Sequence, residues 1–297
     1  MGPVFNQAQA QNTLMWGRRS RRLALFLLAL VVTSVILWGQ GLLSFGLEGE
    51  FQGDRVPPLQ VHPLPPQLAA WQQSLGPRGQ VPETYIDDLE SLPIGGLVWT
   101  EFPVRVYVGD RSALGLPDLP GNQYPNWQQA VRQSLADWDP LIPLQETPTA
   151  DDADIRFFPR KPPLTLGLNR QPRRAAAARA TFRLRWQPVG EPPPQQVTLK
   201  QQFDIDLSPD LAGGHLVGTA RHELGHALGL WGHSPFVDDV MYFSRTATPQ
   251  AISDRDRYTL LALYQRPTRL GWPVPVQSDA RQSSVGPLPL TRVKDLP

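Results

Sequence analysis

Residues 222–233 read His-Glu-Leu-Gly-His-Ala-Leu-Gly-Leu-Trp-Gly-His and contain three of the five histidines in this 297-residue chain. On an α-helix, residues four apart share a face, so His222 and His226 can point at one metal ion. Gly229 is expected to end the helix, because glycine turns at little cost, and the turn would return His233 as a third ligand. Neutral imidazoles bind Zn²⁺, and three protein ligands leave the open position that is typical of catalytic zinc.

Glu223 follows the first histidine, so it is expected to lie beside the metal and not to bind it. A carboxylate in that position can accept a proton from an attacking water, which makes Glu223 the predicted general base. The alternative is a buried amphipathic helix with hydrogen-bonded histidines, but a core helix has no need of a glutamate beside two histidines.

Met241 stands eight residues after His233, in Asp-Val-Met-Tyr at 239–242. A methionine beneath a metal site provides a soft apolar floor. The pattern H-E-x-x-H-x-x-G-x-x-H with a following methionine resembles the metzincin clan of zinc proteases, whose Met-turn Met241 would form. Within the clan, residues 222–230, His233-Ser234 and Met241-Tyr242 are most similar to the matrixins and to matrixin-like proteases predicted in bacteria, including cyanobacteria.

The resemblance implies an α+β catalytic domain with a twisted mixed sheet of about five strands, an active-site helix and a C-terminal helix. It also implies one catalytic zinc on His222, His226 and His233, and a protein or peptide substrate. Typical matrixins are kept latent by a cysteine, but this chain has no Cys, so another device would have to block the site. The formal net charge of +1 gives no indication of nucleic-acid binding. No pattern indicates an oligomeric state.

Residues 1–22 form a basic segment that contains four arginines near its end, and 23–47 carry no charge. An uncharged, largely apolar run of this length can cross a bilayer about 30 Å thick. The arginines place the N-terminus in the cytoplasm by the positive-inside rule. We therefore expect a single-pass signal-anchor with the catalytic domain outside the cytoplasm. A cleaved signal peptide, which would make the protein secreted, is the alternative.

The chain contains 33 prolines, many of them in the segments that flank the expected domain. Residues 48–93 are expected to be a proline-rich stalk or a short pro-segment, with a short helix near 68–75. Residues 94–266 are expected to be the catalytic domain, and 267–297 a proline-rich tail.

Local patterns predict the elements of the domain. Strands are expected at 104–108, 142–147, 153–158 and 196–207, and a helix over 124–141 buries Trp127, Val131, Leu135 and Trp138. Thr219 is a plausible N-cap for the active-site helix, with His215 just before it. Thr248-Pro249 is expected to begin a last helix that ends near residue 264.

Residues 160–185 carry eight arginines and lysines and no acid. They are interpreted either as a solvated loop and edge strand, or as a basic rim. Metzincins bind peptide along an edge strand, which by matrixin order should lie near 175–185, so Arg179 and Arg183 would border the substrate. Asp204, Asp206 and Asp210 are compatible with a calcium ion, or with solvated turns.

Three hypotheses follow. The first is a membrane-anchored zinc endopeptidase that cleaves extracytoplasmic proteins. The second is a non-catalytic, membrane-tethered envelope protein that uses a zinc-bearing scaffold for binding. The third is a protease whose main substrate is its own proline-rich arm.

Overall fold

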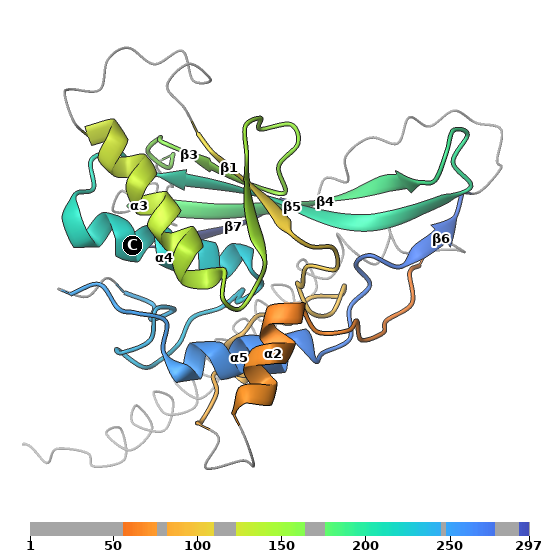
Figure 1. Cartoon of the computed structure of the whole chain (residues 1–297), viewed down its shortest axis with the longest axis horizontal. Helices are drawn as coiled ribbons and strands as arrows, with labels where there is room; N and C mark the ends of the chain where they lie inside the picture. The colour runs from red at the N-terminus through yellow and green to blue at the C-terminus, as the bar shows by residue number, and fades with distance from the viewer. Residues whose placement is uncertain are drawn as a thin grey trace, which may run out of the picture. The chain divides into compact units, whose positions relative to one another are not determined.

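The computed structural model describes residues 56–75, 82–109, 123–163, 176–244, 248–276 and 291–296. The chain divides into two compact units, Met1–Gln52 and Gly53–Pro297, and every described residue belongs to the second unit. That unit has an α+β fold in which the described residues form one mixed sheet and four α-helices (Figure 1). The expected α+β class is therefore confirmed.

The sheet has the strand order β2-β1-β3-β5-β4-β7, and β6 pairs with the beginning of β5. The strands are β1 (Val104–Val108), β2 (Leu144–Thr147), β3 (Ile155–Phe158), β4 (Ala178–Val189), β5 (Gln196–Leu207), β6 (Pro273–Pro275) and β7 (Thr291–Leu296). Strands β2, β1, β3 and β5 run parallel, and β4 runs antiparallel to β5. The expected strand at 196–207 is confirmed with the same bounds.

Helix α3 (Gln123–Trp138) and helix α4 (Gly213–Ala227) pack against each other beside the sheet (Figure 1). The four residues predicted to form the apolar face of α3 are all buried: Trp127, Val131, Leu135 and Trp138. The Trp138 indole nitrogen donates to the Arg221 carbonyl of α4 at 3.0 Å. This contact ties α3 to the middle of α4.

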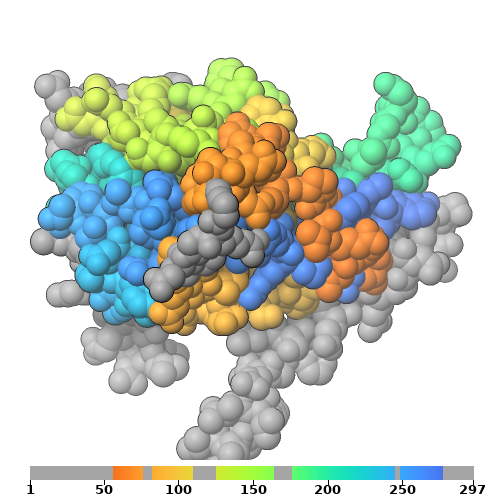
Figure 2. Space-filling model, turned by 60° about the horizontal axis from the view of Figure 1, so that its bottom comes forward, coloured from red at the N-terminus to blue at the C-terminus, as the bar shows by residue number. Residues whose placement is uncertain are grey.

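The described residues of the expected stalk or pro-segment, 56–75 and 82–93, pack on the rest of the unit. Leu68 of α2 (Pro66–Ser74) and Tyr85, just before the 3₁₀ helix η1 (Ile86–Asp88), are 0% and 1% exposed. Figure 2 shows the orange surface of residues 56–75 against the blue surface of later chain, and Trp71 meets Tyr258 edge to face. Proline keeps a chain extended, but an extended chain with apolar anchors can also lie along a domain surface.

The last helix, α5 (Asp254–Tyr264), begins after Ser253 and not at Pro249. Ser253 and Asp256 form a capping box, which satisfies the first amides of the helix more completely than Thr248-Pro249 would. Pro249 instead packs on α4, where a Cβ at Gly214 would lie 2.7 Å from the Pro249 Cγ. The two glycines at 214 and 218 therefore let this loop approach α4 closely.

The segment expected to be a tail contributes two strands to the sheet. Leu270 and Val274 are buried, and β6 pairs with β5, while β7 pairs with β4. Earlier in the chain, His62 stacks on Trp272 with ring centroids 3.9 Å apart. The domain therefore extends on both sides of the expected 94–266.

The expected membrane span at 23–47 lies outside the described residues. Among the helices that the structure does describe, none is both long and apolar enough to cross a bilayer.

Candidate metal centre

Helix α4 carries the first two histidines and the glutamate between them. It begins at Gly213, six residues before the expected N-cap, so Thr219 lies buried within the helix and His215 lies in its first turn. Three glycines in this stretch lower its intrinsic helix propensity, and two of them, Gly214 and Gly218, lie against Pro249. His222, Glu223 and His226 are buried, with 3%, 0% and 0% exposure.

The end of α4 is set by Gly229, as predicted. Its φ is +114°, and the preceding carbonyls of Ala227 and Leu228 accept hydrogen bonds from the Trp99 indole at 2.8 Å and the Tyr264 hydroxyl at 3.2 Å. These donors satisfy carbonyls that a helix end would otherwise leave without partners. The chain then reverses and brings the His233 ring to 5.4 Å from His222 and 5.0 Å from His226.

Replacing Gly229 with Ala is expected to lower the free energy of unfolding by about 2–5 kcal/mol, from backbone strain plus overpacking. An added Cβ would lie 2.3 Å from the Leu97 carbonyl oxygen. Gly190→Ala is the matched control, since Gly190 has φ +88° but no neighbour within 4 Å of its Cβ position. Urea denaturation measures both, and equal losses would show that the close contact with Leu97 is unimportant.

His222, His226 and His233 form one ligand cluster, and one potential ligand atom from each lies within 4.8 Å of the others. Their side chains come from α4 and from the loop that follows it. Among the residues that the structure describes, this is the group of His, Asp and Glu side chains spaced to hold a metal ion. The prediction that these three residues come together is confirmed.

Backbone carbonyls orient two of these rings for metal binding. The Nδ1 atom of His222 lies 2.7 Å from the Val240 oxygen, and that of His226 lies 2.8 Å from the Leu230 oxygen. A ring that donates from Nδ1 keeps its lone pair on Nε2. The Nε2 atom of His222 is buried and makes no hydrogen bond. A buried imidazole nitrogen with this arrangement fits a metal ligand.

The charge state of His222 also suits a metal ligand. Burial, together with the neighbouring His233, lowers the pKa of His222 to about 3, and the contact with the Val240 carbonyl opposes that shift only in part. His222 is therefore neutral near pH 7, which is the form that binds metal ions.

Met241 packs against α4 at Gly225, between His222 and His226 in sequence. It is fully buried, and a Cβ at Gly225 would lie 2.4 Å from its sulfur. Gly225 stands on α4 between His222 and His226, so the thioether packs directly against the helix at that level. The carbonyl that orients His222 belongs to Val240, the residue before Met241.

Two buried carboxylates fix the Met241 segment, and the sequence analysis gave neither a role. Asp239 accepts hydrogen bonds from the hydroxyls of Ser234 at 2.5 Å and Ser253 at 2.7 Å, and it pairs with Arg255 at 3.1 Å. Asp256 accepts from the Val240 amide at 2.9 Å and from the Tyr85 hydroxyl at 2.7 Å.

Burial raises the pKa of Asp256, and the hydrogen bond from Tyr85 opposes this shift. The serine three residues before Asp256 was the available sequence signal, because this spacing is that of a capping box.

Replacing Tyr85 with Phe is expected to destabilise the protein by about 1–3 kcal/mol, because a buried carboxylate loses a donor. Tyr258→Phe is the matched control, since it removes a phenolic hydroxyl from α5 while keeping the ring contact with Trp71. Thermal unfolding compares the two variants. A loss in Tyr85→Phe no larger than in the control would contradict a structural role for the Tyr85–Asp256 bond.

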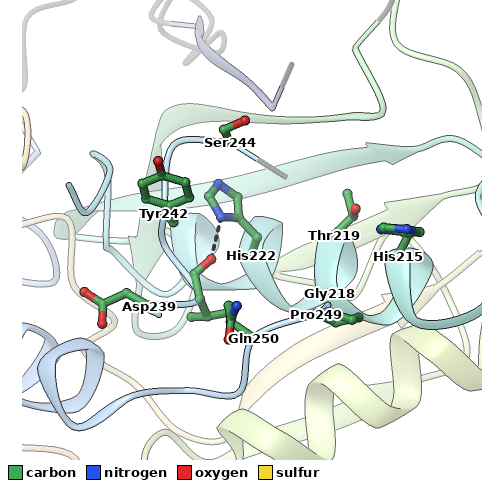
Figure 3. A pocket seen from close by; sticks show the side chains of 10 residues that line it. His215, Gly218, Thr219, His222, Asp239, Tyr242, Ser244, Pro249 and Gln250 are labelled. Atoms are coloured by element: carbon green, nitrogen blue, oxygen red, sulfur yellow. Dashed lines mark hydrogen bonds between the residues drawn. The ribbon is translucent and has the colours of Figure 1, made fainter. Parts of the chain in front are cut away.

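A pocket opens beside His222 between α4 and the Met241 segment (Figure 3). His215, Thr219 and His222 of α4 line it, and Tyr242 and Ser244 face them. The pocket therefore lies next to the ligand cluster.

The two arginines of β4 that were predicted to border a substrate make contacts within the domain. Arg183 donates to Asp204 at 2.5 Å, and Arg179, 8% exposed, donates to the Pro163 carbonyl at 3.0 Å. A role for these two arginines at the substrate stays a prediction.

The carboxylates considered for calcium are held by cations. Asp204 pairs with Arg156 and Arg183, Asp206 with Arg160, and Asp210 with Lys161. Their charge is already balanced, which disfavours a calcium ion between them.

Comparisons with models of known protein families and with curated proteins found no match to this chain.

Proposed function

We propose that the protein is a zinc-dependent endopeptidase of the metzincin type, similar to the matrixins. The observation that carries the proposal is the convergence of His222, His226 and His233 around one point, with Glu223 buried on the same helix. The methionine packed under that helix further supports a metzincin-type site. The donor set, three imidazoles, suits Zn²⁺ among common protein metals.

The metal, when bound, would act as a Lewis acid on the scissile carbonyl and lower the pKa of an adjacent water. The proton transfers and the orientation of the ligands depend on residues of the chain. The carboxylate of Glu223 accepts a proton from the attacking water and passes it to the nitrogen of the leaving amine. The carbonyls of Val240 and Leu230 hold the His222 and His226 rings in one tautomer.

We further propose that the catalytic domain acts outside the cytoplasm, on proteins near a membrane. The support is the uncharged run at 23–47 after four arginines. Cleavage after that run would release the same domain as a secreted enzyme.

The test is zinc content together with peptide-library cleavage by the purified full-length chain in detergent. About one zinc per chain is expected, with cleavage abolished by a chelator and restored by added Zn²⁺. A chain that binds one zinc but cleaves no peptide, even with its C-terminal strand released as described below, would instead indicate a zinc-bearing binding protein.

A further inference from the structure

Strand β7 covers the outer edge of β4. Residues 291–296 pair with 178–183 in antiparallel register, from Ala178 opposite Leu296 to Arg183 opposite Thr291. Strand β4 therefore lies between β5 and β7 (Figure 1). Without β7, the backbone amides and carbonyls on that side of β4 would form an open sheet edge.

The covered half of β4 is the half that lies next to the metal centre. Phe182 meets the Trp231 ring edge to face at 5.0 Å, and Trp231 in turn lies 5.7 Å from the His226 ring. The other half, from Leu184 to Val189, pairs only with β5 among the described residues. Strand β7 thus pairs with the half of β4 that contacts Trp231, the neighbour of the His226 ring.

An open sheet edge binds an extended peptide through main-chain hydrogen bonds, largely independently of sequence. The same backbone groups of β4 cannot bind β7 and a second strand at once. A peptide that adds to this half of β4 must therefore displace residues 291–296.

We propose that β7, by pairing with the outer edge of β4 at 178–183, is an internal competitor for the edge on which an extended peptide substrate of a metzincin-type enzyme would bind. This inference rests on the proposed endopeptidase function and adds its regulation. A competing strand would provide latency in a chain that has no cysteine to block the metal. It also restricts substrates to segments that are already unfolded and able to pair as a strand.

The test releases β7 in the full-length chain with Arg292→Pro/Val293→Pro. Adjacent prolines remove two successive amides, one of which faces β4 in an antiparallel ladder. Ser283→Pro/Ser284→Pro, in the same tail but outside β7, is the matched control. We expect the KM for a fluorogenic peptide to fall at least about tenfold with kcat unchanged. The reason is that molecules with an open β4 edge are a small fraction of the parent protein but most of the released variant. The control should behave as the parent.

A second readout does not depend on hydrolysis. A labelled peptide with the sequence of residues 288–297 is titrated into each protein carrying Glu223→Gln, and binding is followed by fluorescence anisotropy. Binding to the released chain and not to the parent supports the proposal, even if no protein cleaves any peptide. In that case the proposed endopeptidase function would be wrong, but the proposal that β7 blocks a peptide-binding edge of β4 would be supported.

Equal KM values and equal peptide binding in the parent and released chains would overturn the proposal while leaving hydrolysis intact. Deletion of residues 288–297 is the second variant. If both this deletion and the proline variant unfold, as judged by circular dichroism, then β7 is part of the core and is no displaceable competitor.

Discussion

Glu223→Gln is expected to lower kcat for peptide hydrolysis by about 10²–10⁴-fold, the usual contribution of a positioned general base. The amide has nearly the same size as the carboxylate but cannot accept the proton of the attacking water. Glu223 is fully buried in α4 beside His222, so the substitution should leave the fold and the ligand cluster in place. The measurement is kcat for a fluorogenic peptide, compared between the parent and variant proteins at equal zinc content.

Two controls make this result specific. Zinc content must stay at the parent level, because glutamine replaces no predicted ligand. Glu146→Gln alters an exposed glutamate that pairs with Arg132, and its kcat should not change. If the Glu223→Gln chain kept its zinc and its full kcat, Glu223 would not be the general base.

His226→Ala is expected to lower zinc affinity by about 10²-fold or more, which is roughly one ligand's share of the free energy of a zinc site. His226 is fully buried, and its ring lies 4.7 Å from His222 and 5.0 Å from His233. Two histidines alone would leave the metal weakly held, and hydrolysis should fall with occupancy. Competition with a zinc-binding dye measures the affinity directly.

His215→Ala is the matched control for this experiment. His215 stands on the same helix and is exposed in its first turn, outside the ligand cluster. Its removal should leave zinc affinity unchanged. If the two variants lost zinc equally, the loss would reflect a general disturbance of α4, and His226 would not be shown to be a zinc ligand.

The ligand cluster could be predicted from sequence because its geometry is local. The four-residue spacing places His222 and His226 on one face, and Gly229 supplies the positive φ that reverses the chain. Strands β1, β3 and β5 and helix α3 were also predictable, since each carries its own pattern of buried residues. In these cases the information lies within one segment.

The errors concern contacts between distant segments. Pro249 packs on Gly214 and Gly218 of α4, and Tyr85, in the described segment 82–109, reaches Asp256, 171 positions away. Strand β7 pairs with a strand more than a hundred residues earlier. No local sequence pattern indicates which distant segment a residue will contact. The proline-rich composition of the flanking segments instead favoured the prediction that they lie outside the domain.

The hydrogen bonds that join Tyr85, Asp256 and Val240 determine where the smallest autonomous unit begins. The Tyr85 hydroxyl supports the carboxylate that holds the Val240 amide, and the Val240 carbonyl orients His222. A fragment that begins at residue 94 contains every predicted ligand yet lacks this support and the buried Leu68. Any cut that releases the domain from its N-terminal region must therefore fall before Leu68 if these contacts are to be kept.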